Sequence, residues 1–170
     1  MNFKSLIRDI PNFPKEGVIF KDITLLLQSP TTLKETANAL FHLLEGQKID
    51  KVVGMESRGF IFGPILAEKL DAGFVPVRKS GKLPSTTISE TYDLEYGTDT
   101  LEIHIDGIEK GDRVLIHDDV LATGGTASAA CKLIEKLGGE IVQCNFLIEL
   151  TFLEGDSKIS NYQVKSLIKY

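Results

Sequence analysis

The sequence of 170 residues predicts an α/β fold, a mainly parallel twisted sheet flanked by helices. Short apolar runs rich in β-branched residues, typical of buried strands, alternate with segments whose apolar residues recur at helical spacing. Most connections between these segments are short. With 42% hydrophobic and 25% charged residues, a chain of this length can bury a sizeable core, so we expect one domain over residues 1–170.

The N-terminal segment, residues 1–28, begins with apolar side chains at helical spacing over residues 2–10, which predict a short helix. Pro11 and Pro14 then enforce an extended backbone. Residues 18–23 are too apolar for a solvated linker. We expect them to fold back onto the domain as a strand or loop.

The next elements are a helix, a strand, a second helix and a second strand. Ser29 and Pro30 provide a hydroxyl cap and a first-turn proline for a helix that ends near Gly46. Residues 51–55 read as a short buried strand, and residues 60–70 as the helix that follows it. We expect the second strand at residues 73–77.

Residues 78–97 are expected to form a lid loop. They begin with three cations within five residues, Arg78, Lys79 and Lys82, and continue with many Ser and Thr residues and little apolar periodicity. A loop of this length is uncommon in a compact domain and usually serves as a lid or is disordered. We therefore expect a mobile lid.

The remaining elements are predicted from periodicity in the same way. We expect strands at residues 98–105, 114–119, 141–150 and 163–168, and a helix over residues 127–137 that Gly138 closes. His117 should point opposite Asp118 and be packed or interfacial rather than catalytic. Cys131 and Cys144 are expected to be buried free thiols.

The chain is organised around residues 114–127, in which a buried strand passes through two carboxylates and a loop of small residues into a helix. Gly124 and Gly125 can turn backbone N–H groups inward because they have no Cβ. The hydroxyls of Thr123 and Thr126 add donors beside the positive end of a helix. Such a loop suits a phosphate monoester.

Asp118 and Asp119, at the end of the strand, offer acceptors to a diol such as the 2′- and 3′-hydroxyls of a ribose. A ribose 5-phosphate therefore fits the whole stretch. A Walker A loop would need Lys where Gly125 stands, and no G-x-G-x-x-G follows any strand. The alternative is an ordinary strand-to-helix turn in which Asp119 or Thr123 only caps the helix.

The sequence V-L-I-H-D-D-V-L-A-T-G-G-T at residues 114–126 closely resembles the phosphoribosyl-pyrophosphate signature of the type I phosphoribosyltransferases. G-M-E-S-R-G-F at residues 54–60 resembles their pyrophosphate loop, with Ser57 where Ala is common. Arg58 there is also a planar cation where a strand ends, which suits pyrophosphate. R-K-S-G-K-L-P at residues 78–84, with L-E-Y-G at 94–97, matches the lid of the adenine-specific members; Ser85 departs from the Gly often found there.

The N-terminal pattern Pro14-x-x-Gly17-Val-x-Phe20-x-Asp22 is similar to the hood of those adenine-specific members, in which an aromatic ring stacks on the base. Lys21 stands where many members have Arg. The resemblance thus spans almost the whole chain at four places in the family's order. It implies the type I phosphoribosyltransferase-like fold and the conversion of adenine and phosphoribosyl pyrophosphate to AMP and pyrophosphate.

The resemblance also implies a set of site residues. Ribose and 5-phosphate would contact Asp118, Asp119, Ala122, Thr123, Gly124, Gly125 and Thr126; pyrophosphate would contact Ser57, Arg58, Arg78, Lys79 and Lys82; adenine would contact Val18, Phe20, Lys21 and Tyr96. Glu95, carried by the lid, is the catalytic candidate, placed near N7 of the base. Mg²⁺ is expected to bind mainly through phosphoribosyl pyrophosphate, so we assign no metal ligand to the protein.

Composition and charge limit the partners. A net charge of −5 argues against a nucleic-acid-binding surface, and we find neither a signal-peptide profile nor an apolar run long enough to span a bilayer. We therefore expect a cytoplasmic protein with no membrane partner, and the resemblance implies a homodimer. Two alternatives remain: a sibling enzyme for xanthine or a 6-oxopurine, and a non-catalytic purine regulator that binds phosphoribosyl pyrophosphate.

Overall fold

The structure of the protein is a computed structural model, in which residues 1–94 and 97–170 are described. The chain forms two compact units, residues 1–39 and residues 40–170. The boundary between them falls inside helix α2 (Pro30–His42).

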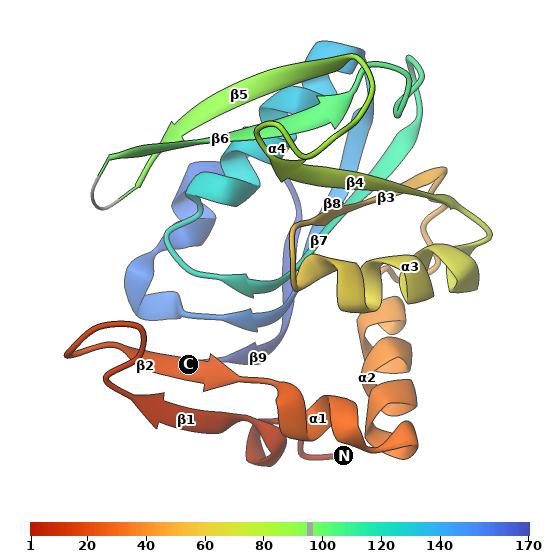
Figure 1. Cartoon of the computed structure of the whole chain (residues 1–170). Coiled ribbons are helices and arrows are strands. Elements are labelled where there is room, and N and C mark those ends of the chain that lie inside the picture. The colour runs from red at the N-terminus through yellow and green to blue at the C-terminus, as the bar shows by residue number, and fades with distance from the viewer. Residues whose placement is uncertain (95–96) are drawn as a thin grey trace. The chain divides into compact units, whose positions relative to one another are not determined.

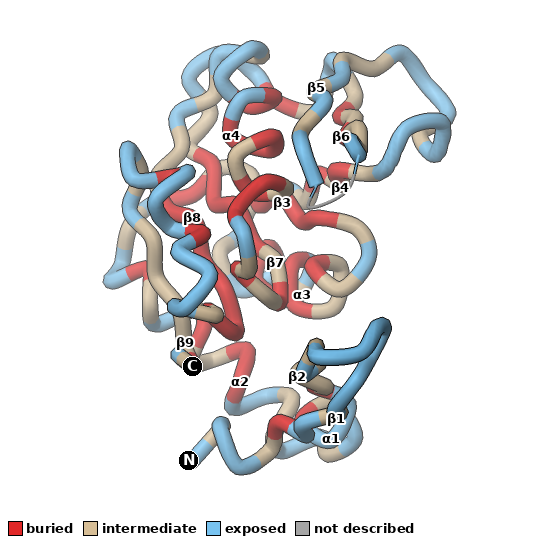
Figure 2. The backbone as a smooth tube through the Cα atoms, turned by 90° about the vertical axis from the view of Figure 1, so that its left-hand side faces the viewer, coloured by how far each residue is buried: buried red, intermediate tan, exposed pale blue. Residues whose placement is uncertain are grey.

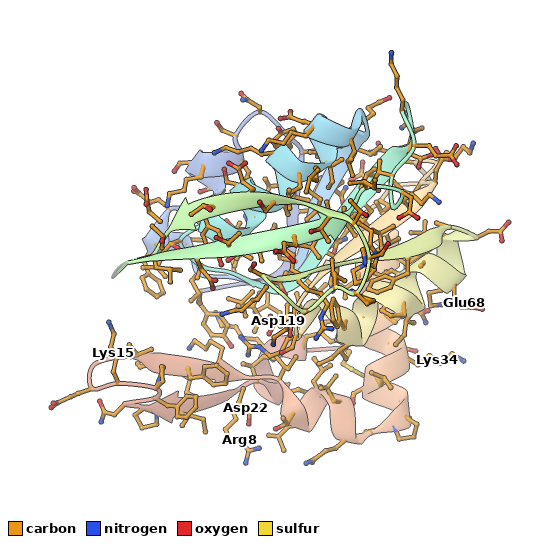
Figure 3. All side chains as sticks on the ribbon, turned by 45° about the horizontal axis from the view of Figure 1, so that its top comes forward. Arg8, Lys15, Asp22, Lys34, Glu68 and Asp119 are labelled. Carbon is orange, nitrogen blue, oxygen red and sulfur yellow. The ribbon has the colours of Figure 1, made fainter. Side chains whose placement is uncertain are left out.

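The first unit contains a two-stranded antiparallel hairpin, β1 (Arg8–Pro11) and β2 (Ile19–Asp22). A 3₁₀ turn, η1 (Phe3–Leu6), precedes it, and helix α1 (Thr24–Gln28) follows it. The expected helix over residues 2–10 is therefore wrong beyond the first turn, because the backbone of residues 8–11 pairs with β2 instead. The register places Arg8 opposite Asp22, and their side chains form an ion pair at 2.9 Å (Figure 3).

The second unit is built on a sheet of seven strands in the order β5-β6-β4-β3-β7-β8-β9 (Figure 1). The strands are β3 (Lys51–Met55), β4 (Gly73–Lys79), β5 (Thr87–Asp93), β6 (Thr98–His104), β7 (Arg113–Leu121), β8 (Glu140–Glu149) and β9 (Val164–Lys169). Strands β4, β3, β7, β8 and β9 pair in parallel, and β6 pairs antiparallel with both β4 and β5. The mainly parallel sheet is confirmed.

Two helices cover opposite faces of this sheet, α3 (Gly59–Leu70) and α4 (Gly125–Leu137). Successive residues of a strand point to opposite faces. Ile116 of β7 belongs to the apolar cluster that includes α4, whereas the next residue, His117, contacts Phe62 of α3 with ring centroids 6.4 Å apart. Strand β7 is thus covered on both sides, as Figure 2 shows by the buried residues along it.

The interior residues that we predicted to have no chemistry are packed as expected. His117 is fully buried, and its Nδ1 lies 3.3 Å from Oδ1 of Asn145. Burial lowers the pKa of His117 to about 4, so the ring is neutral at physiological pH. Cys131 and Cys144 are buried free thiols whose Sγ atoms lie 3.9 Å apart.

Much of the segment that we expected to be a loop is instead strand β5, paired with β6. Ile88, Glu90 and Tyr92 are half-buried, and the residues between them are exposed. The Glu90 carboxylate faces α4 and pairs with Lys132 at 3.1 Å and Lys136 at 2.7 Å. An inward carboxylate interrupts the apolar alternation by which strands are recognised, which explains why the sequence pattern did not indicate this one.

Two short 3₁₀ helices between β8 and β9 were not predicted either. They are η2 (Thr151–Leu153) and η3 (Gly155–Ile159). Their side chains are exposed except at Gly155 and Ile159. Ile159 belongs to the core cluster beside α4, so η3 is fixed to the body of the second unit.

Candidate active site

Asp118 and Asp119 lie near the carboxyl end of β7, a strand at the centre of the sheet that pairs with β3 on one side and β8 on the other. Asp119, which is labelled in Figure 3, is buried, with 3% of its surface exposed, and Asp118 is half-buried. One carboxylate oxygen of Asp118 accepts a hydrogen bond of 2.8 Å from the backbone N–H of Asp119. Two neighbouring carboxylates with little water around them form an unusual arrangement that requires a positive partner.

Both carboxyl groups have raised pKa values. For Asp118, burial is the main cause, and the adjacent charge of Asp119 adds to it. For Asp119, burial raises the pKa against the opposing effect of Arg58, whose Nε lies 3.0 Å from Oδ2 of Asp119. The pair therefore favours any ligand that brings positive charge or hydroxyl donors.

The phosphate loop, which we define as residues 122–126, comprises the connection from β7 to α4 and the first two residues of α4. Gly124, the N-cap of α4, has a left-handed φ of 77° and provides no side-chain capping hydrogen bond to the helix, which begins at Gly125. The N–H groups of the first turn of a helix have no intrahelical partner and bind anions well. A cavity of about 80 Å³ lies at this loop, lined by residues 120–127 together with Met55, Asp118 and Phe146.

The second loop of the site joins β3 to α3 and carries Ser57, which is exposed, and Arg58. Arg58 links this loop to the carboxylate pair through its contact with Asp119. The first residue of α3, Gly59, lies against the end of β7: a Cβ there would be 2.9 Å from the His117 carbonyl oxygen and 3.1 Å from Oδ1 of Asp118. Only glycine allows α3 to begin so close to Asp118.

The cations of the predicted lid are organised by a residue that we did not single out, Glu56. Its carboxylate accepts two hydrogen bonds from Arg78, each 3.2 Å, one of 2.8 Å from Nζ of Lys82 and one of 3.1 Å from the backbone N–H of Lys79. Burial alone would raise the pKa of Glu56, but the hydrogen bonds from Lys82 and Arg78 outweigh it and lower the pKa to about 2.

The side chain of Lys79 has a different partner, Asp99 of β6. The two groups lie 2.9 Å apart, and the hydrogen bond and charge of Asp99 raise the pKa of Lys79. Tyr92 of β5 lies between this pair and the phosphate loop. Its hydroxyl is 3.5 Å from Oδ2 of Asp99 and accepts a hydrogen bond of 3.3 Å from Thr126.

Glu56 had a signal in the sequence that we did not use. It directly follows a buried strand, at the edge where Asp118 also stands, and it is flanked by the motif residues Ser57 and Arg58. The roles of Asp99 and Tyr92 have no such signal. They depend on the pairing of β5 with β6, which the sequence pattern did not indicate.

The predicted adenine contacts lie elsewhere in the chain. Val18, Phe20 and Lys21 belong to the first unit, where the Phe20 ring packs edge-on to Phe13 with centroids 5.2 Å apart. Nζ of Lys21 lies 2.7 Å from Oδ1 of Asp9. The other two predicted residues, Glu95 and Tyr96, lie outside the described residues.

The second unit therefore brings together the phosphate loop, the carboxylate pair, Arg58 and a group of cations held by Glu56. In the described ranges, no cluster of three or more His, Cys, Asp or Glu side chains is arranged to hold a metal ion. A hard cation such as Mg²⁺ still suits this site, because Mg²⁺ commonly binds through one or two carboxylates together with ligand phosphates. No helix within residues 1–94 and 97–170 is long and apolar enough to cross a membrane.

Comparisons with known proteins agree with this geometry. Residues 23–168 match the family model of the phosphoribosyl transferase domain. The chain is 64% identical over 170 residues to an adenine phosphoribosyltransferase of Flavobacterium johnsoniae, with all of both chains covered.

Among solved structures, the adenine phosphoribosyltransferase of Thermoanaerobacter pseudethanolicus superposes with a TM-score of 0.97 at 52% identity, covering 99% of this chain and 98% of that one. The Saccharomyces cerevisiae enzyme, complexed with an imino-altritol bisphosphate and adenine, gives a TM-score of 0.92 at 44% identity, covering 97% and 96%.

Proposed function

The chain belongs to the phosphoribosyltransferase family, and from that premise we propose how its site transfers the 5-phosphoribosyl group of phosphoribosyl pyrophosphate to adenine, giving AMP and pyrophosphate. The observation that carries the proposal is the adjacency of an uncapped helix N-terminus to two low-exposure carboxylates at the end of β7. The first binds the 5-phosphate and the second binds the ribose hydroxyls.

The carboxylate pair also suits the chemistry at the sugar. Displacement of pyrophosphate from the anomeric carbon passes through an oxocarbenium-like centre, which carries positive charge. Asp118 and Asp119 place carboxyl groups in surroundings poor in water, where electrostatic stabilisation of a positive centre is strong. Because the positive charge on the sugar grows in the transition state, the pair binds that state more tightly than the ground state.

Pyrophosphate leaves toward the second loop and the lid cations. Arg58, together with Arg78, Lys79 and Lys82, neutralises the departing group, and Ser57 contributes a hydroxyl. Glu56 accepts hydrogen bonds from the Arg78 and Lys82 side chains. These cations are therefore already held beside the loop between β3 and α3, where we place the pyrophosphate. Mg²⁺, when bound to phosphoribosyl pyrophosphate, supplies further neutralisation of its phosphates.

Adenine binds through the first unit. The family resemblance implies that Phe20 offers a ring for stacking and that Val18, Lys21 and Tyr96 also contact the base. The yeast relative solved with adenine supports this choice of base. Glu95 contacts the base near N7 and manages its proton, and closure of the lid excludes the water that would otherwise capture the sugar centre. Mg²⁺ dependence, a homodimer and a role in cytoplasmic purine salvage complete the proposal.

A steady-state assay of nucleotide formation from each purine base tests the proposal. We expect AMP from adenine, and much slower reaction with hypoxanthine, guanine and xanthine, because a pocket that accepts hydrogen bonds from the 6-amino group leaves its acceptors unpaired against a carbonyl. Faster reaction with any of the three 6-oxo bases would assign the chain to a sibling enzyme. Binding of phosphoribosyl pyrophosphate without turnover of any base would indicate a regulator.

A further inference from the structure

The turn formed by η2 and η3, residues 151–159, lies against the phosphate loop. We propose that Gly155, the first residue of η3, is a positioning residue that sets where the loop's N–H groups point. The inference deepens the proposed function, on which it rests, by naming what holds the phosphate subsite in shape. Gly155 belongs to none of the motifs that identify the site.

The backbones of the turn and the loop are in contact with no side chain between them. A Cβ on Gly155 would lie 2.1 Å from the carbonyl oxygen of Ala122 and 2.8 Å from the backbone nitrogen of Gly124. In the reverse direction, a Cβ on Gly124 would lie 2.2 Å from the carbonyl oxygen of Gly155. Real Cβ atoms essentially never approach closer than 3.0 Å, so both positions require glycine.

The two glycines are required for different reasons. Gly124 also has a left-handed φ of 77°, which disfavours other residues whatever the space. Gly155 does not have a positive φ, so its requirement comes from the close approach alone. It is also buried in a segment whose other members, apart from Ile159, are exposed.

The turn is fixed on both sides of Gly155. The backbone N–H and the hydroxyl of Thr151 both donate to the carbonyl oxygen of Tyr170, at 2.9 and 2.5 Å, and the N–H of Leu150 donates to the carbonyl oxygen of Leu121 at 2.9 Å. On the other side, Ile159 is anchored in the core. The turn is therefore a firm support against which the loop rests.

The support matters because the loop binds through its backbone. The N-cap of α4 is Gly124, which has no side chain to bond the first N–H groups of the helix, so the positions of these groups follow from the path of residues 122–124. To bring the Ala122 contact from 2.1 Å to 3.0 Å, a Cβ at position 155 must displace the loop, the turn or both by about 0.9 Å. Displacements of about 1 Å at a positioned group can lower activity about 10²-fold.

Gly155→Ala tests the proposal, with Gly73→Ala as the matched control. Gly73 also lacks a positive φ, but a Cβ there meets only the flexible side chain of Lys51, at 3.1 Å. We would measure the Kd of ribose 5-phosphate by calorimetry, the KM of phosphoribosyl pyrophosphate and the melting temperature. We expect Gly155→Ala to raise the Kd and the KM at least about tenfold in protein that is still folded at the assay temperature.

The control should match the parent in all three measurements. A Gly155→Ala protein with the parent's Kd and KM would overturn the proposal. If Gly155→Ala does not fold, Thr151→Val tests whether the turn supports the loop. This variant removes one of the two hydrogen bonds to the Tyr170 carbonyl oxygen. It should raise the Kd of ribose 5-phosphate about threefold. A Kd equal to the parent's would then overturn it.

The binding measurement separates this inference from the proposed function. A parent protein that binds ribose 5-phosphate but forms no AMP would refute the proposed reaction while leaving the comparison between Gly155→Ala and the parent valid. If the parent forms AMP and the Gly155→Ala variant is equally active and binds ribose 5-phosphate equally tightly, only the positioning role of Gly155 is refuted.

Discussion

Replacing Glu56 by Gln should destabilise the fold at neutral pH, because it removes the charge that Arg78 and Lys82 share. The Glu56 side chain is 10% exposed, and its pKa falls from an ordinary 4.5 to about 2. At about 1.4 kcal/mol for each pKa unit, the native hydrogen bonds and charges favour the ionised carboxylate by about 3 kcal/mol. The Lys82 side chain is 48% exposed, and solvent weakens its interaction with Glu56. We therefore expect Glu56→Gln to lower the free energy of unfolding by about 1.5 kcal/mol at least and about 3 kcal/mol at most.

The effect should depend on pH in a direction that the pKa fixes. Glu56 has a lower pKa in the folded protein than in the unfolded chain, so its ionised carboxylate stabilises the fold. This stabilisation is complete above the unfolded-state pKa of 4.5 and is lost as the pH falls through the folded-state pKa of about 2. The difference in free energy of unfolding between the parent and Glu56→Gln should therefore be full at pH 7 and fall to less than half by pH 3.

Urea unfolding at pH 7, 4 and 3 measures this difference, with Glu68→Gln as the control. Glu68 lies exposed on α3, where its side chain points away from the protein (Figure 3), and its replacement should change stability by about 0.5 kcal/mol or less. A Glu56→Gln protein as stable as the control at pH 7, or a difference that does not shrink on acidification, would show that Glu56 does not organise the cations as we describe.

Four further predictions concern the reaction. Asp118→Asn should lower kcat more than it raises the KM of phosphoribosyl pyrophosphate. The variant should be as stable as the parent at pH 7 or more stable, because a carboxyl whose pKa is raised by burial destabilises the fold once the pH exceeds that pKa. A normal kcat with a lower melting temperature would show that the role of Asp118 is structural. AMP formation should require a divalent metal, and equal turnover in excess chelator would contradict this. Mixing Lys79→Ala and Asp119→Ala chains should restore some activity in the heterodimer if Lys79 serves the neighbouring site; no recovery after verified subunit exchange would mean that each site is built from one chain. Glu95→Gln should lower the single-turnover rate about 10²-fold without loss of stability, and a rate equal to the parent's would make Glu95 a bystander.

The features predicted correctly from the sequence are those that depend on neighbours along the chain. The run from Val114 to the first turn of α4 shows its strand, its carboxylates and its glycines within fourteen residues, and the structure has β7, the phosphate loop and α4 in that order. The buried strands β3 and β8 and the burial of His117 follow from the same local periodicity.

The features that the sequence did not reveal depend on residues far apart in the chain. Strand β5 escaped recognition because its inward Glu90 is neutralised by two lysines about 45 residues later, and hydrophobic periodicity carries no information about such a partner. The bonds from Glu56 to Arg78 and Lys82 span 22 and 26 residues, and they form only once parallel pairing has brought the ends of β3 and β4 side by side.

The sequence by itself thus determined the order of strands and helices and the loop that suits a phosphate, because both depend on the spacing of residues that are close together in the chain. Only the tertiary structure decided how that loop is held. Gly155 follows Gly124 by 31 residues, and nothing in its surroundings in the sequence distinguishes it from a glycine in an exposed turn. Its role depends on two backbones that meet at a distance where no Cβ fits, and such a contact exists only after the chain has folded.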